Sequence, residues 1–108
     1  MDWIEYKKED AIDYLPHVKQ IIEEEKLDKP NRRRDIVHQR FFLMWYLREN
    51  TSMTLTEIGK LFLKDHSTVI HAVDYHFNSI DINDSLYFKN VERIKMYLEA
   101  IENEFHST

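Results

Sequence analysis

The chain contains no cysteine, one glycine and two prolines. Without cysteine it can form neither a disulfide nor a thiolate metal site. A β-sandwich or barrel needs a turn roughly every 8–12 residues, and those turns are rich in glycine and proline, so an all-β fold is disfavoured. The 108 residues are instead 43% hydrophobic and 13% aromatic. This composition is typical of one folded domain with a sizeable core, not of a disordered chain.

Long apolar runs are also missing. No stretch approaches the roughly 18 uncharged apolar residues that a membrane-spanning helix needs. The first ten residues carry charges throughout and lack the apolar run of a signal peptide. We therefore expect a cytoplasmic protein that has no membrane partner.

Basic residues are fewer than acidic ones, with 15 against 20 and a net charge of -5, which taken alone argues against a nucleic-acid partner. The distribution changes that interpretation: residues 1–28 carry -5, residues 29–71 carry +4, and residues 72–108 carry -4. Salt screens charges beyond roughly 10 Å, so a basic centre can bind phosphate despite its acidic flanks. The alternative is that the flanks and the centre simply pair with each other.

Three stretches show the apolar spacing of long helices. Segment 15–27 contains Pro16, a residue suited to a first helical turn. Segment 35–50 is apolar nearly all round, which predicts a central buried helix. From Leu86 onward the apolar residues fall on one face, which predicts a packing helix, with a partner-binding helix as the alternative.

A pair of shorter helices joined by a tight turn is predicted between these stretches. Thr54 and Glu57 form a capping box for the first helix, and Asp65 suits the N-cap of a second helix over 66–80. Gly59 inside the first helix predicts the close approach of a neighbouring helix. Two helices this near along the chain form a helix-turn-helix candidate, although an ordinary αα-hairpin gives the same pattern. In a helix-turn-helix, the first turn of the second helix enters the major groove of DNA.

A resemblance to a known family covers residues 32–73. The segments that carry it are RRRDIVHQR (32–40), LRE (47–49), TSMTLTEIGKLF (51–62) and KDHSTVIHAV (64–73). In order and spacing they resemble the C-terminal DNA-binding domain of the bacterial replication initiator DnaA, whose signature is Asp-His-Ser/Thr-Thr-Val-x-His-Ala. The resemblance implies an all-α domain of about five helices over 1–108, with a Trp-repressor-like helix-turn-helix.

The resemblance also implies which basic residues contact DNA. Arg32, Arg33 and Arg34 match the family's basic loop, and Arg32 falls on the arginine that enters the minor groove. A narrow A·T-rich minor groove attracts arginine electrostatically. Arg40 and Arg48 match basic positions that contact phosphate, which would explain two charges on an otherwise apolar helix.

The starts of the two short helices carry the remaining contacts. Leu55 and Thr56 match a backbone–phosphate contact of the kind that a helix N-terminus supplies. The base readers of the family match Asp65, His66, Ser67 and Thr68. Three further positions are added from charge and helical face alone: Lys60, Lys64 and His71.

The chain departs from the family's pattern in its turn and in some contact positions. Leu63 stands alone where the family has two glycines, so the angle between the two helices is expected to differ. Phe41, Thr56 and Ser67 differ from the common Gln, Pro and Thr, so the family's nine-base-pair box should not be assumed. The chain has no Gly-x-x-x-x-Gly-Lys-Ser/Thr. We therefore expect a stand-alone DNA-reading module that does not hydrolyse ATP.

Metal and enzyme chemistry are not expected, and no cofactor is implied. His66, His71 and His76 are five residues apart, so successive side chains point about 140° apart on a helix, and no His-Glu-x-x-His is present. His76 falls on the apolar face, which predicts a core residue. Ser67 with Asp65 and His66 lacks the strand–turn–helix that presents a serine nucleophile.

The sequence thus predicts specific binding of double-stranded DNA, linked to replication initiation or its control. The 66–80 helix would enter the major groove and the 32–34 loop the adjacent minor groove. Two alternatives stay open: a protein-interaction module that contacts replication proteins, and a transcription regulator on the same scaffold.

Overall fold

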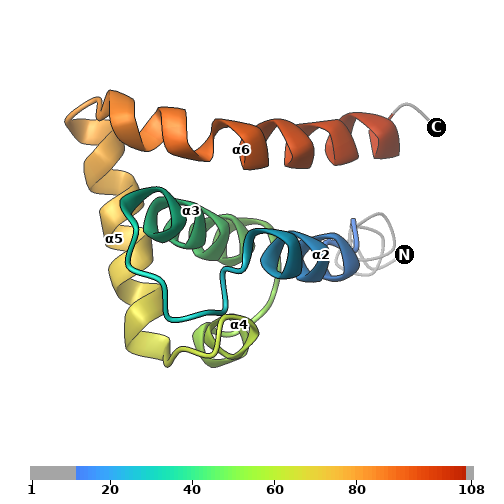
Figure 1. Cartoon of the computed structure of the whole chain (residues 1–108). Helices are drawn as coiled ribbons and strands as arrows, with labels where there is room; N and C mark the ends of the chain where they lie inside the picture. The colour runs from blue at the N-terminus through green and yellow to red at the C-terminus, as the bar shows by residue number, and fades with distance from the viewer. Residues whose placement is uncertain (1–11, 107–108) are drawn as a thin grey trace.

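The computed structural model describes residues 12–106, and all regular structure within that range is helical. The helices are α2 (Leu15–Glu25), α3 (Arg34–Asn50), α4 (Leu55–Leu61), α5 (His66–Asp81) and α6 (Ser85–His106). Each helix predicted from apolar spacing is present, with ends that differ by two residues or fewer where the prediction gave a boundary. The all-α class and the helix-turn-helix made by α4 and α5 are confirmed (Figure 1).

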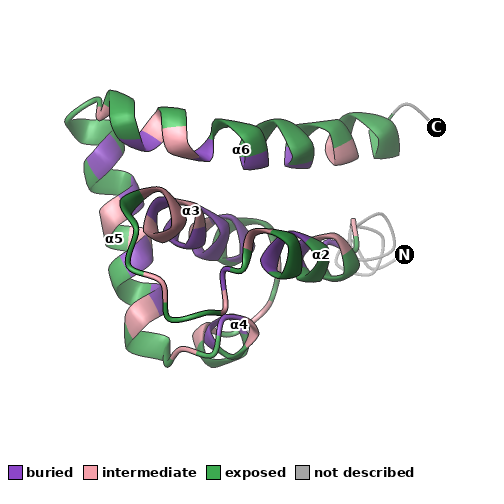
Figure 2. Ribbon diagram, in the orientation of Figure 1, coloured by how far each residue is buried: buried purple, intermediate pink, exposed green. Residues whose placement is uncertain are grey.

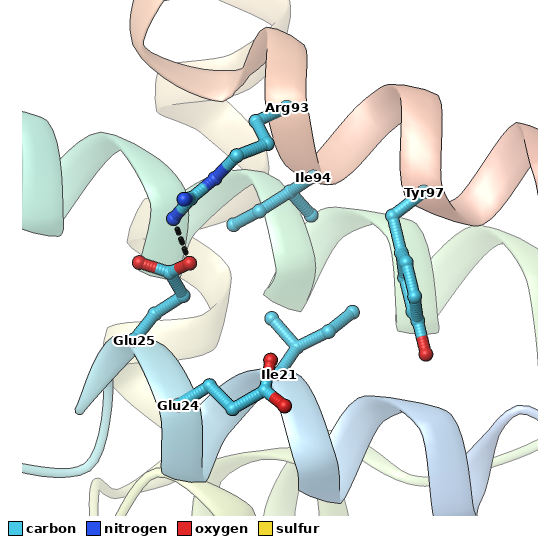
Figure 3. A pocket seen from close by; sticks show the side chains of 6 residues that line it. All are labelled: Ile21, Glu24, Glu25, Arg93, Ile94 and Tyr97. Atoms are coloured by element: carbon cyan, nitrogen blue, oxygen red, sulfur yellow. Dashed lines mark hydrogen bonds and ion pairs between the residues drawn. The ribbon is translucent and has the colours of Figure 1, made fainter.

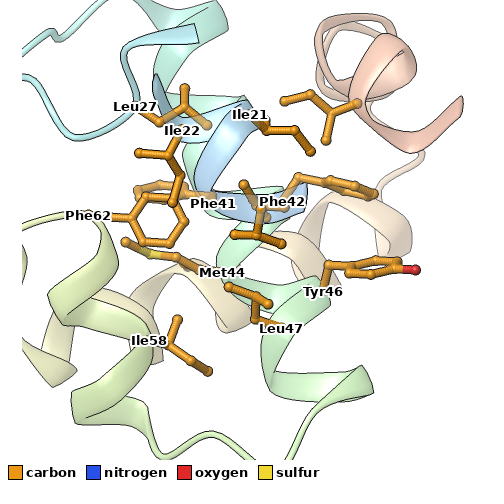
Figure 4. Close-up of a cluster of buried hydrophobic side chains, with 14 of the residues drawn as sticks. Ile21, Ile22, Leu27, Phe41, Phe42, Met44, Tyr46, Leu47, Ile58 and Phe62 are labelled. Atoms are coloured by element: carbon orange, nitrogen blue, oxygen red, sulfur yellow. The ribbon is translucent and has the colours of Figure 1, made fainter. Parts of the chain in front are cut away.

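Helix α3 is the centre of the domain and packs against α4, α5 and α6. Eight of its residues are buried: His38, Arg40, Phe41, Phe42, Leu43, Met44, Tyr46 and Leu47. Figure 4 shows several of these side chains meeting residues from α2 and α4 in one apolar cluster. Helix α3, which is apolar nearly all round, is therefore surrounded by the other helices, as its sequence predicts.

Helix α6 runs alongside α2 and closes the other side of the core (Figure 1). Figure 3 shows Ile21 and Ile94 facing each other between the two helices, with Arg93 paired to Glu25 across the gap. The outward side of the α6 ribbon is exposed along its length, whereas its buried residues lie on the side that faces α2 and α3 (Figure 2). This pattern makes α6 a packing helix, as its one-sided sequence predicts.

Two buried histidines connect the central helices through hydrogen bonds. His38 Nε2 lies 2.9 Å from Tyr75 Oη, and its Nδ1 lies 3.1 Å from Asn90 Nδ2. His76 Nδ1 lies 2.8 Å from Tyr87 Oη. Burial lowers the pKa of both imidazoles, that of His76 to about 4. The prediction that His76 is a hydrogen-bonded core residue is confirmed.

Three of the helices end on a left-handed residue that is not glycine. Lys26, Leu63 and Asn83 have φ values of 56°, 58° and 53°. At each end, the N–H of the following residue donates to a carbonyl five positions earlier, at 2.9 to 3.0 Å. This is the Schellman arrangement, which usually has glycine at the left-handed position. The one glycine of the chain, Gly59, is not at any of these positions, so Lys26, Leu63 and Asn83 take the left-handed conformation instead.

Candidate nucleic-acid interface

The first helix of the helix-turn-helix begins at a complete capping box, as predicted. Thr54 Oγ1 accepts from the Glu57 N–H at 3.1 Å, and the Glu57 carboxylate accepts from the Thr54 N–H at 2.9 Å. The Thr54 backbone N–H, followed by the Thr54 side chain, holds the pKa of the Glu57 carboxyl below its ordinary value. Leu55 is half-buried under this turn and Thr56 is exposed on it. Thr56 thus lies on the molecular surface at the N-terminus of α4.

The turn between α4 and α5 is tight because Gly59 lets two backbone segments touch. A Cβ at Gly59 would lie 2.6 Å from the carbonyl oxygen of Lys64 and 3.0 Å from that of Asp65. The Gly59 carbonyl in turn accepts from the Lys64 N–H at 2.9 Å. The predicted close approach is confirmed, and the segment that approaches is the residue pair leading into α5.

Leu63 closes the same turn where the family has two glycines. It adopts φ 58°, its side chain is 73% exposed, and its N–H donates to the Lys60 carbonyl at 3.2 Å. A left-handed conformation costs a residue with a Cβ about 1–2 kcal/mol. The shorter turn is therefore accommodated by one strained residue.

Asp65 is the N-cap of α5 and also fixes the hydroxyl groups of the first turn. Asp65 Oδ1 accepts from the Thr68 N–H at 3.1 Å, from Ser67 Oγ at 2.6 Å and from Thr68 Oγ1 at 3.3 Å. The Ser67 hydroxyl, followed by the Thr68 N–H, holds the pKa of Asp65 below its ordinary value. His66, Ser67 and Asp65 are exposed and Thr68 is half-buried. The structure thus gathers three of the four expected base readers on one exposed helical turn.

The opposite face of α5 fixes how this turn is presented. Its buried residues are Val69, Ala72, His76 and Ser79. His71 is exposed but lies edge-on to Phe41 of α3, with ring centroids 5.3 Å apart. The helix is therefore held against α3 along one side while its first turn stays free of that contact.

Three arginines lie at the surface where the loop after α2 passes into the first residue of α3. Arg32, Arg33 and Arg34 are all exposed. Arg33 donates its N–H to Asn31 Oδ1 at 2.9 Å, and its guanidinium pairs with Asp35 at 3.0 Å. An ion pair this exposed contributes little free energy, so Arg33 can exchange it for a phosphate.

The other expected basic residues are spread over three places: Arg48 is on α3, Lys60 is on α4, and Lys64 is in the turn between α4 and α5. Arg48 and Lys60 are exposed and Lys64 is half-buried. Lys29, which was not among the expected site residues, lines a shallow groove with Lys19 and Lys60, and the acidic Glu23 and Asp28 line the same groove. Its only signal in the sequence is its position inside the stretch 29–71 of net charge +4.

Arg40 differs from what we expected of a phosphate contact. Its side chain is buried, with 5% of its surface exposed. Its guanidinium donates to the carbonyls of Leu27 at 2.8 Å, Lys29 at 3.0 Å and Asn31 at 3.4 Å. These carbonyls belong to the loop before α3. They explain why a charged side chain interrupts the apolar surface of this helix, because Arg40 faces the loop and not the solvent.

Residues 12–106 hold no group of three or more His, Asp or Glu side chains arranged to bind a metal ion. No helix within the described range is long and apolar enough to cross a membrane.

Comparison with known proteins matches this region to one family. The model of the bacterial dnaA protein helix-turn-helix matches residues 19–75, which run from α2 through most of α5. Chromosomal replication initiator protein DnaA of Thermoanaerobacter sp. is 36% identical over 69 residues, or 64% of this chain and 15% of the relative. The DnaA protein of Thermomicrobium roseum is 50% identical over 46 residues, or 42% of this chain and 10% of the relative. The DnaA protein of Deinococcus deserti is 33% identical over 73 residues, or 68% of this chain and 16% of the relative.

The chain thus spans about a seventh of the length of the relatives it matches. No solved structure matches it significantly. The family match covers the capped helix pair, the basic loop before α3 and the central helix that joins them. The chain belongs to the family of bacterial dnaA protein helix-turn-helix domains.

Proposed function

We propose that the chain binds double-stranded DNA sequence-specifically and acts in replication initiation or its control. The observation that carries this proposal is the exposed first turn of α5, where Asp65, His66 and Ser67 stand free of the core. Three exposed arginines, in the loop before α3 and at its first residue, supply local positive charge although the net charge of the chain is -5. The relatives are named as chromosomal replication initiators, which supports the replication role.

In this proposal the first turn of α5 reads bases in the major groove. An ionised carboxylate only accepts hydrogen bonds, so Ser67 gives its one hydroxyl proton to Asp65. The lone pairs that remain on Ser67 Oγ can only accept. In the major groove, only the amino groups of adenine and cytosine donate. Ser67 is therefore suited to select an adenine or a cytosine.

Phosphate and minor-groove contacts would come from the basic residues around that turn. Arg32, Arg33 and Arg34 enter the adjacent minor groove in this proposal, where a narrow groove attracts guanidinium groups. Arg48 and Lys60 neutralise phosphates on either side. These contacts position the duplex without reading its sequence, and they make affinity depend on salt.

Ser67 gives the first test of base reading. Bound sites would be selected from a random duplex pool, and each adenine or cytosine would then be replaced by an analogue that lacks the amino group. At the position that Ser67 reads, the analogue should lower the affinity of the wild-type chain about fivefold, which corresponds to the free energy of one hydrogen bond. Ser67→Ala should bind the natural site equally weakly and lose nothing more with the analogue. If every analogue is tolerated by the wild-type chain, Ser67 does not read an amino group.

A pair of variants tests whether reading and anchoring are separate. His66→Ala should cost about 1–3 kcal/mol on the selected site and little on random duplex, because His66 contacts bases. Arg48→Ala is the matched control and should weaken both duplexes alike, because phosphates are the same in every sequence. Fluorescence anisotropy at fixed salt measures both. Equal losses on the two duplexes for His66→Ala would contradict base reading by this residue.

One observation favours the protein-interaction alternative. Ile70, Phe77 and Ile80 are exposed on α5 by 45–48% each, and a DNA contact at the first turn does not need them. In that alternative the fold is kept but a replication protein covers α5. Absence of any binding to random duplex at low salt and micromolar protein would favour it over DNA binding.

A further inference from the structure

Arg40 is buried at the contact between α3 and the loop that precedes it. The guanidinium bonds the carbonyls of Leu27, Lys29 and Asn31, three alternate residues of one loop. The loop is a turn and not a strand, since the Lys29 N–H donates to the Lys26 carbonyl at 3.3 Å, and the guanidinium collects carbonyls from both sides of this turn. One planar side chain therefore holds a five-residue length of backbone against α3.

The charge of Arg40 is balanced by these carbonyls alone within the part of the chain that the structure describes. The ion pairs there join Arg33 to Asp35, Arg93 to Glu25 and Lys95 to Glu99, and none involves Arg40. Burial lowers the pKa of Arg40, because desolvation penalises its charged form. An apolar side chain would fill this space without that penalty. What the guanidinium adds is a set of directional bonds to the loop.

The loop that Arg40 holds leads directly into the basic residues. Leu27 anchors one end, since its side chain is fully buried. At the other end Asn31 is fixed twice, by its N–H to the Lys29 carbonyl at 2.8 Å and by its Oδ1 to the Arg33 N–H at 2.9 Å. Arg32 lies between these bonded residues, with an exposed side chain on a fixed backbone.

We infer that Arg40 is a positioning residue for DNA binding: it holds the loop so that Arg32 is presented to the minor groove. The inference rests on the proposed function. It replaces the direct phosphate contact that we expected of Arg40, because Nε and Nη2 are already bonded to the protein. Preorganisation of this kind raises affinity, since the loop is ordered before DNA binds.

A double-mutant cycle separates positioning from direct contact. Arg40→Lys keeps the positive charge but has a single nitrogen, which cannot span three carbonyls. On the selected site, Arg40→Lys should weaken binding about tenfold in the wild-type background and less than about twofold in the Arg32→Ala background. With Arg48→Ala, a phosphate contact away from the loop, the loss should stay near tenfold.

Equal losses in all three backgrounds would overturn the inference, since a direct phosphate contact by Arg40 is additive. Urea unfolding checks that each variant is folded. If Arg40→Lys is not, Arg40→Gln carries the same cycle, because it leaves no buried charge. Failure of the wild-type chain to bind any duplex would instead overturn the proposed function, and the role of Arg40 with it.

Discussion

Gly59→Ala is expected to lower the free energy of unfolding by about 3 kcal/mol, the upper range for overpacking a close contact. Alanine is the better helix former, so helix propensity alone predicts a gain of about 1 kcal/mol at this position in α4. The added methyl would lie 2.6 Å from the Lys64 carbonyl oxygen, a distance that no Cβ tolerates. That oxygen belongs to backbone and cannot rotate away, so the segment leading into α5 must shift. Urea unfolding followed by circular dichroism measures the loss.

The control for helix propensity is the reverse change at an exposed site. Ala100→Gly in α6 should cost about 1 kcal/mol, since Ala100 is exposed and only its propensity changes. Gly59→Ala should also weaken binding to the selected DNA site, because displacing Asp65 moves the base-reading turn. A stabilised Gly59→Ala variant with unchanged affinity would show that the turn does not need this close contact.

The helix starts were predictable because each depends on residues close together in the sequence. The Thr54–Glu57 capping box and the Asp65 N-cap require only a side chain and a backbone N–H three residues away. Pro16 likewise acts within its own turn. Local rules of this kind hold whatever the rest of the chain does, so the helix-turn-helix was visible in the sequence.

Arg40 was not predictable in the same way. On a helical wheel it interrupts an apolar face, and both a solvent-facing and a buried arginine fit that pattern. Its burial depends on the path of the loop over 26–33, which brings the carbonyls of Leu27 and Asn31 onto α3. That path is set by a left-handed Lys26 and the buried Leu27, neither of which has a strong signal in the sequence.

The candidate surface was predictable in its residues but not in its arrangement. Charge counting placed the positive potential in the middle of the chain, and the exposed arginines 32–34 agree with it. The groove shared by Lys29 and Lys60 joins positions 31 residues apart, which periodicity does not detect. The left-handed Leu63 likewise follows from how α4 and α5 meet, not from the preference of leucine.

The free energy of unfolding is expected to fall as the pH drops below about 6.5, mainly because of His76. His76 is only 4% exposed, and its ring stacks on that of Trp45 with centroids 3.7 Å apart. Its pKa is lowered by burial from 6.5 to about 4. Between those values only the unfolded chain binds a proton at this histidine, so acid favours unfolding. Above the range neither state is protonated there, and below it both are.

The full difference corresponds to about 3 kcal/mol, of which about 2 kcal/mol is lost by about pH 5. Burial also lowers the pKa of His38, so its contribution has the same sign. Urea unfolding at about pH 7.5 and pH 5 measures the loss, and His76→Gln supplies the comparison because glutamine is polar but does not titrate. The variant should be less stable at neutral pH, since it loses the stacking on Trp45, yet should lose less stability on acidification. An equal acid-induced loss in the two proteins would mean that His76 is already protonated in the fold or is not the group responsible, and a titration of its imidazole by NMR would distinguish these outcomes.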